Sequence, residues 1–159
     1  MDVIIEQVSE ILIAWGLPGL FMAALLAGSV LPFSSELVLV ALIKLGFEPI
    51  SCIIAASLGN TVGGMTCYYM GHLGKMNWIE KVFKVKKDKI DKMAQFLHGK
   101  GSMMAFFTFL PFFGEVIAIT LGLMRSNIWI TISSMFTGKL VRYIIMVWVL
   151  QETINMIIS

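Results

Sequence analysis

The chain has 159 residues, enough for one domain, and 58% of them are hydrophobic while only 14% are charged. A soluble domain is normally about one-quarter charged, and the mean hydropathy here is +0.87. These values exclude an ordinary water-soluble domain and indicate an all-α integral membrane protein. With a net charge of only +2, no nucleic-acid partner is expected.

Residues 1–16 predict a helix that lies along the membrane surface. Asp2, Glu6 and Glu10 share one face of this helix, opposite an apolar face that ends at Trp15. This pattern favours an interfacial helix over a membrane span. Because the first ten positions carry acids and no basic residue, a cleavable signal peptide is not expected.

Residues 17–74 predict a broken hairpin followed by a full transmembrane helix. Pro32 interrupts the first apolar block midway, and Glu36 follows it. An arm of about 13 residues reaches roughly 20 Å, less than the roughly 30 Å of bilayer hydrocarbon. The block is therefore predicted to turn at Pro32 and leave on the side it entered. Such a re-entrant hairpin needs protein cover or a wet cavity for its broken backbone.

The apolar block over residues 50–74 is long enough to cross the membrane once. It is rich in small residues, and we expect Gly59 and Gly63 to let neighbouring helices pack closely. Cys52 and Cys67 both fall within apolar sequence. A thiol in that setting is usually a small packing residue, so neither a disulfide nor a metal site is expected.

Residues 75–101 predict a basic amphipathic connector on the membrane surface. The segment carries eight Lys against three acidic residues, and its apolar residues recur at helical spacing. Short positively charged loops stay in the cytoplasm. This rule places the connector inside and both the N-terminal helix and the C-terminus outside.

Residues 102–159 repeat the plan of a broken block followed by a full span. Pro111 interrupts the block and Glu115 follows it, and the last span carries Lys139 and Arg142 within its apolar sequence. Charges at such a depth are costly in a bilayer and usually functional.

The two halves share an internal repeat. The motif Leu-Pro-Phe-x-x-Glu occurs twice, 79 residues apart, and the same offset aligns Gly59 and Asn60 with Gly138 and Lys139. We expect Gly138 to serve helix packing, as Gly59 does. A hairpin makes no net crossing and a span makes one, so the second unit starts on the opposite side. The predicted fold is therefore an inverted repeat, which is typical of transporters with a mid-membrane site.

Four motifs resemble those of a known family over residues 16–145. The chain is similar to the DedA superfamily, also called the VTT or SNARE-associated Golgi-type membrane proteins, and within it to the small YqaA-like branch. The resemblance implies two opposed re-entrant hairpins, a location in the prokaryotic cytoplasmic (inner) membrane, and proton-coupled movement of phospholipids or polyprenyl phosphates. The motifs are Pro32-Phe33-Ser34-Ser35-Glu36, Gly59-Asn60-Thr61-Val62-Gly63-Gly64, Phe109-Leu110-Pro111 with Gly122, and Gly138-Lys139-Leu140-Val141-Arg142-Tyr143.

The chain departs from this family at its anion-binding arginines. The larger branch has an Arg three residues before the second hairpin proline and another three residues after it, where this chain has Thr108 and Gly114. Its acid after the glycine of the first full span is replaced by Asn60. The positive charge is therefore expected from Lys139 and Arg142 on the last span.

Two interpretations of the charged residues are open. Glu36 and Glu115 are either proton-linked transport acids or caps on the helices that restart after the breaks. Arg142 and Lys139 either hold a phosphate group, with Asn60 as a further substrate-binding residue, or pair with the two glutamates.

The chain contains no known catalytic motif, so it is not expected to be an enzyme or to carry a cofactor. The leading hypothesis is a lipid or lipid-phosphate translocase, resembling a flippase or scramblase and coupled to protons. One alternative is a proton- or cation-coupled carrier of a small solute, and another is a non-transporting membrane scaffold. Two half-spanning hairpins make a thin barrier, and a homodimer is one arrangement consistent with it.

Overall fold

A computed structural model of the chain describes residues 2–29, 35–110 and 113–158. Every regular element in these ranges is a helix, which confirms the predicted all-α class. The predicted hairpin breaks at Pro32 and Pro111 lie outside the described residues. The helices are α1 (Asp2–Gly28), α2 (Ser35–Lys44), α3 (Pro49–His72), α4 (Met76–Phe83), α5 (Lys87–Leu97), the 3₁₀-helix η1 (Gly101–Phe109), α6 (Phe113–Leu123) and α7 (Ile128–Ile158).

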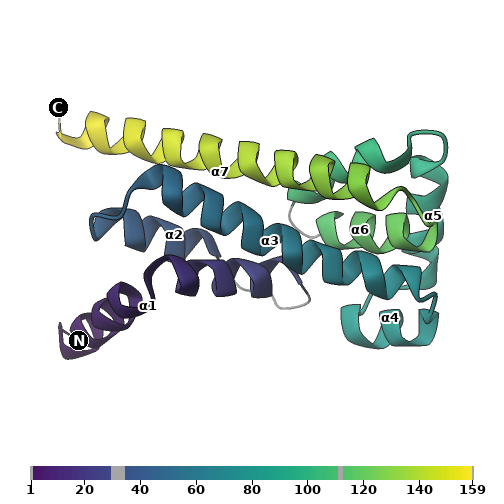
Figure 1. Ribbon diagram of the computed structural model, residues 1–159, viewed down its shortest axis with the longest axis horizontal. Coiled ribbons are helices and arrows are strands. Elements are labelled where there is room, and N and C mark those ends of the chain that lie inside the picture. Colours follow the sequence, from purple (N-terminus) through teal and green to yellow (C-terminus); the bar gives the residue numbers. More distant parts are fainter. Residues whose placement is uncertain (1, 30–34, 111–112, 159) are drawn as a thin grey trace.

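Helix α1 consists of two arms that meet at a kink. Gly16 has φ 44° and ψ −128°, a conformation outside the helical region that only glycine adopts readily. The N-terminal arm therefore leaves the direction of the second arm, as the purple end of the ribbon shows (Figure 1). The kink falls at the predicted end of the interfacial segment. The location of residues 1–16 in the membrane interface stays a prediction.

Helices α3 and α7 form the long axis of the molecule and run in opposite directions (Figure 1). They are long and apolar enough to cross a membrane. Their 24 and 31 residues correspond to about 36 and 46 Å at roughly 1.5 Å per residue. At the start of α7 the Asn127 side chain accepts backbone N–H groups of Trp129 and Ile130, at 3.0 and 3.3 Å, and so caps the helix.

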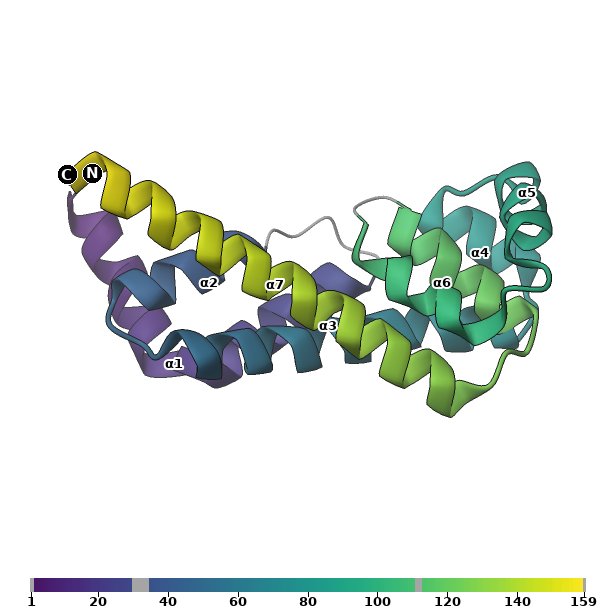
Figure 2. The ribbon, with the colours of Figure 1, turned by 90° about the horizontal axis from the view of Figure 1, so that it is seen from above.

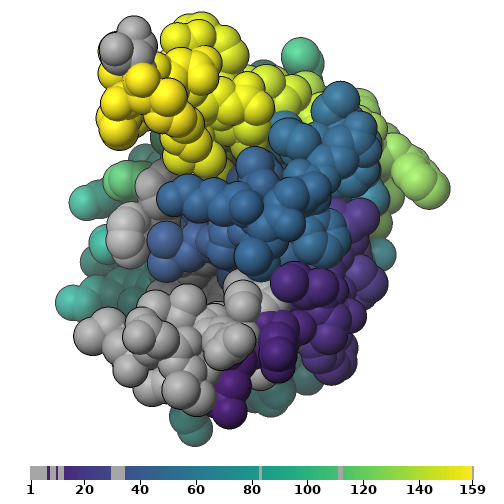
Figure 3. Space-filling view, turned by 90° about the vertical axis from the view of Figure 1, so that its left-hand side faces the viewer, coloured from purple at the N-terminus to yellow at the C-terminus, as the bar shows by residue number. Residues whose placement is uncertain are grey.

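The shorter helices are divided between the two ends of this axis. Helices α1 and α2 occupy the end that holds both termini, and η1 and α6 occupy the other end with α4 and α5 (Figures 1 and 2). Seen end-on, the C-terminal turns of α7 lie above the blue link between α2 and α3 (Figure 3).

Large apolar side chains cover the outside of the molecule. Such an extensive apolar surface is unusual for a protein in water and is suited to lipid. On α7 the exposed apolar residues include Trp129, Ile130, Ile144, Ile145, Trp148 and Val149.

Two local features of the chain between α3 and α6 were not specified by the sequence pattern. The predicted basic connector forms two helices, α4 and α5, because the chain turns at Lys84, which has a left-handed φ of 52°. The first arm of the second block is the 3₁₀-helix η1, whose tighter winding has weaker hydrogen-bond geometry than an α-helix. The buried side chains Ile90 and Leu97 lie on α5, which packs against α6.

Glycines allow the helices to approach through their backbones. A Cβ at Gly59 or Gly63 would overlap backbone oxygens of α1, those of Phe21 and Leu25 respectively. A Cβ at Gly138 would similarly overlap the Phe106 carbonyl of η1. The glycines assigned to packing therefore lie where helix backbones touch, an arrangement common in membranes.

Replacing Gly63 by Ala should destabilise the protein. The added methyl group would force α1 away from α3, and overpacking of this kind costs about 1–3 kcal/mol. Thermal unfolding in detergent measures the change. The control is Val62→Leu, which enlarges the neighbouring exposed side chain and should leave the midpoint nearly unchanged; equal losses in the two variants would contradict the backbone contact.

Candidate functional site

The centre of the molecule is the crossing of α3 and α7, where a lysine reaches a backbone carbonyl. Lys139 is buried, only 4% exposed, and its Nζ donates to the backbone oxygen of Asn60. Gly64, one turn further along α3, leaves space for the ammonium and for Met135, since a Cβ there would lie 2.8 Å from Nζ and 2.6 Å from Met135 Sδ. A buried cation needs such acceptors to offset the loss of its hydration.

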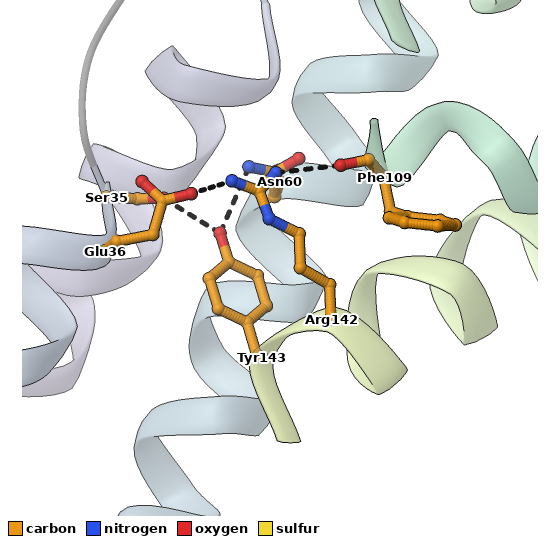
Figure 4. Close-up of polar contacts among 6 residues, drawn as sticks. All are labelled: Ser35, Glu36, Asn60, Phe109, Arg142 and Tyr143. Atoms are coloured by element: carbon orange, nitrogen blue, oxygen red, sulfur yellow. Dashed lines mark hydrogen bonds and ion pairs between the residues drawn. The ribbon is translucent and has the colours of Figure 1, made fainter. Parts of the chain in front are cut away.

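Tyr143 connects three helices beside this crossing. Its hydroxyl lies 2.8 Å from Ser35 Oγ at the start of α2, and it accepts a hydrogen bond from Asn60 Nδ2 at 3.2 Å. Tyr143 and Ser35 are each 1% exposed. Buried polar groups are costly unless paired, so this small network holds the first turn of α2 against α3 and α7 (Figure 4).

Arg142 joins the two interrupted blocks. Its guanidinium pairs with the Glu36 carboxylate in the first turn of α2 and donates to the backbone oxygen of Phe109, the last residue of η1, at 3.0 Å. Figure 4 shows the side chain reaching between these two groups. The side chains of Arg142 and Glu36 are 31% and 26% exposed. The pair is therefore accessible, in contrast to Lys139.

Glu115, the repeat equivalent of Glu36, lies on the first turn of α6. Its side chain is partly buried and its charge interacts with that of Lys139. Both acids thus interact with a cation of α7. Glu36 forms an ion pair with Arg142, and Glu115 interacts with Lys139 electrostatically without a hydrogen bond between them.

The site around Thr108 and Gly114 has no room for the arginines of the larger branch. Thr108 is buried and its hydroxyl donates to the Ala105 carbonyl at 2.7 Å. A Cβ at Gly114 would overlap the Thr108 backbone oxygen. The two arms of the second block are packed against each other at these positions.

The structure brings together most residues that the sequence selected. Arg142, Glu36 and Asn60 belong to one group of polar contacts, and Lys139 joins it through the Asn60 backbone. Glu115 interacts with this group only through its charge, since its side chain forms no hydrogen bond with the described residues.

Three members of this group received no role from the sequence. Ser35 and Tyr143 supply the hydroxyl network, and Gly64 supplies the space for Lys139. Each stands beside a residue that was selected or within a quoted motif, but only the fold shows that they meet. A tyrosine in an apolar span is by itself a common membrane residue.

An all-helical fold with two helices long and apolar enough to cross a membrane is suited to a membrane protein. Its sequence matches the model of the VTT domain over residues 17–152, and the chain belongs to this family, part of the DedA superfamily.

Named relatives support the same class. The chain is 28% identical over 134 residues to the inner membrane protein YqaA of Escherichia coli, covering 82% of this chain and 88% of the relative. It is 29% identical to an uncharacterized protein of Haemophilus influenzae, covering 79% and 81%. The uncharacterized membrane protein YkoX of Bacillus subtilis is 32% identical over 82 residues, 49% of this chain and 37% of that protein. No solved structure matches the chain. The protein is thus a bacterial inner membrane protein.

The contact between Gly64 and Lys139 predicts non-additive stability changes. Gly64→Ala adds a methyl group that would press on both Met135 Sδ and the ammonium; it should displace the ammonium from Asn60 and lower the free energy of unfolding by about 1–2 kcal/mol. In a Lys139→Ala background the same change should cost less, because residues in contact couple by about 0.5–3 kcal/mol. Thermal unfolding in detergent measures all four proteins. The control is Gly71→Ala, whose added methyl group would meet the Ile119 backbone instead. If Gly71→Ala is as non-additive with Lys139→Ala as Gly64→Ala is, the contact between Gly64 and Lys139 does not cause the coupling.

Tyr143→Phe should remove the hydroxyl that links α2 to α3. The loss leaves Ser35 Oγ and Asn60 Nδ2 without this partner, at a cost of about 1–3 kcal/mol in unfolding free energy. The matched control is Tyr69→Phe, because Tyr69 is 52% exposed. If both variants unfold at the wild-type temperature, the hydroxyl network does not stabilise the junction.

Proposed function

We propose that the protein translocates a lipid or lipid phosphate across the inner membrane, with phospholipids and polyprenyl phosphates as the substrate class. The observation that carries this proposal is Arg142, an accessible cation within an apolar span, at the junction of both interrupted blocks. It lies 14 positions after Ile128, about 21 Å along the helix at roughly 1.5 Å per residue. A guanidinium at that depth suits bidentate recognition of a phosphate.

We also propose the inverted repeat, with re-entrant hairpins, as the frame of this transport. Lys139 and Asn60 are 79 residues apart and in contact. A residue that touches its own repeat equivalent lies at a pseudo-twofold axis, as in an isologous interface. The hydrogen bond between Asn60 and Tyr143 also has a counterpart at the same offset, the approach of Lys139 to Gly64. Both pairs support an axis through the crossing of α3 and α7.

Protons are the proposed coupling ion, and Glu36 and Glu115 are the proposed acids. Each lies in the first turn of the helix that follows an interrupted segment, and each has a cation of α7 as its counter-charge. A carboxylate that alternates between a proton and a cation can link proton movement to the state of the site. Capping of the same helices is compatible with this role.

Reconstitution into liposomes tests the proposal. Purified protein is placed in vesicles containing a fluorescent phospholipid or a fluorescent polyprenyl phosphate, with and without a pH gradient, and movement between leaflets is followed by quenching from outside. Wild-type protein should move at least one of these lipids. Arg142→Lys should slow it by about tenfold or more, equivalent to roughly 1.4 kcal/mol in the barrier.

Matched variants separate the competing functions. Arg125→Lys makes the same substitution outside the junction, in the link between α6 and α7, and should transport normally. Gln at both Glu36 and Glu115 should abolish the effect of the pH gradient. If lipid stays in its leaflet under every condition, the translocase is refuted and the solute-carrier alternative remains. If cells that carry only the double Gln variant grow like wild-type cells, the scaffold alternative is favoured.

A further inference from the structure

The guanidinium of Arg142 is accessible but already holds an anion of the protein itself. Its partners are the Glu36 carboxylate and the Phe109 carbonyl, which come from α2 and η1. Of these two contacts only the one with Glu36 neutralises the charge. A phosphate group that binds Arg142 bidentately through Nη2 competes with this carboxylate for the same side of the guanidinium.

We propose that Glu36 is an internal competitor for the anion site of Arg142, so that a phosphate group binds by displacing the carboxylate. The inference rests on the proposed function and adds to it the order of events at the site. The ligand class is a phosphate monoester or diester, carried by a lipid headgroup or free in solution.

The surroundings of the pair favour exchange over simultaneous binding. A carboxylate and a phosphate on one guanidinium would leave net negative charge in an apolar layer, where isolated charge is costly. Lys139 cannot accept the displaced acid in its place, since that ammonium is buried against the Asn60 carbonyl. The Phe109 carbonyl stays available to orient Arg142 after Glu36 leaves.

Exchange links ligand binding to the position of α2. Glu36 is next to Ser35, whose hydroxyl is hydrogen-bonded to Tyr143 on α7. When the carboxylate leaves Arg142, the first turn of α2 loses its charged contact with α7, while the hydroxyl contact of Ser35 with Tyr143 stays. Occupation of the site by phosphate therefore weakens the connection between α2 and α7, while η1 remains bound through Phe109.

The direction in which Glu36→Gln changes the affinity for phosphate distinguishes a competitor from a supporting residue. If Glu36 only positions Arg142, its loss weakens phosphate binding. If Glu36 competes, Glu36→Gln frees the guanidinium and tightens binding, by about tenfold if the lost competition is worth roughly 1.4 kcal/mol.

Equilibrium binding to purified protein in neutral detergent measures this change in affinity. The probes are dihexanoyl phosphatidic acid, glycerol phosphate and inorganic phosphate, titrated calorimetrically into wild-type protein and the Glu36→Gln variant. Tightening with the phosphatidic acid alone identifies a lipid headgroup, and tightening with all three identifies a free phosphate group. Arg142→Gln should abolish binding in either background.

Two controls complete the experiment. Glu48→Gln removes an exposed acid that accepts from Ser51 at 2.8 Å, away from Arg142, and should leave affinity unchanged. Glu36→Asp shortens the competitor while keeping its charge, and should give a gain of about threefold, roughly 0.65 kcal/mol; it replaces the Gln variant if that protein does not fold.

The exchange is refuted if a folded Glu36 variant binds every probe no more tightly than wild type does. That result leaves the proposed function untouched if the wild-type protein moves lipid in liposomes. Conversely, tightening without any lipid movement keeps the exchange and refutes translocation.

Discussion

The contact between the Lys139 ammonium and the Asn60 carbonyl joins the two long helices at their centre, and the polar structure of the protein is arranged around it. Burying an ammonium is costly unless acceptors replace its water. The approach is possible because α3 has a glycine, Gly64, opposite the ammonium. Arg142 and Tyr143 follow Lys139 by three and four positions, so they emerge on the same side of α7.

From this face α7 reaches both interrupted blocks. Tyr143 ties the first turn of α2 to α3, and Arg142 connects Glu36 with the end of η1. The end of a helix leaves backbone groups without a partner in the helix, and protein groups must satisfy them where water does not. Arg142 performs this task for the Phe109 carbonyl and neutralises an acid with the same side chain. One helix thereby sets the relative positions of two blocks distant in sequence.

The charges divide into two unequal pairs. Arg142 and Glu36 are partly exposed and in direct contact, whereas Lys139 is buried and interacts with Glu115 only through its field. Each cation on α7 is thus matched by an acid from a different block, which limits the cost of charge in an apolar layer. The Arg142–Glu36 pair is partly exposed, whereas the buried Lys139 holds the crossing together through the Asn60 carbonyl.

Much of this architecture is determined by the sequence, because hydrophobic length and helix breaks are local properties. The apolar blocks predict α3 and α7, and Gly16 marks the kink in α1. The repeated motif selects Glu36 as a functional candidate, and the position of a charge within an apolar span selects Arg142. The partners of these charges depend on how the helices cross, which involves residues up to 108 positions apart, as for Ser35 and Tyr143. Only the tertiary structure decided that Lys139 is enclosed while Arg142 stays partly exposed, because Lys139 lies against Gly64 and Asn60 of α3 whereas Arg142, one turn further along α7, lies between the ends of α2 and η1.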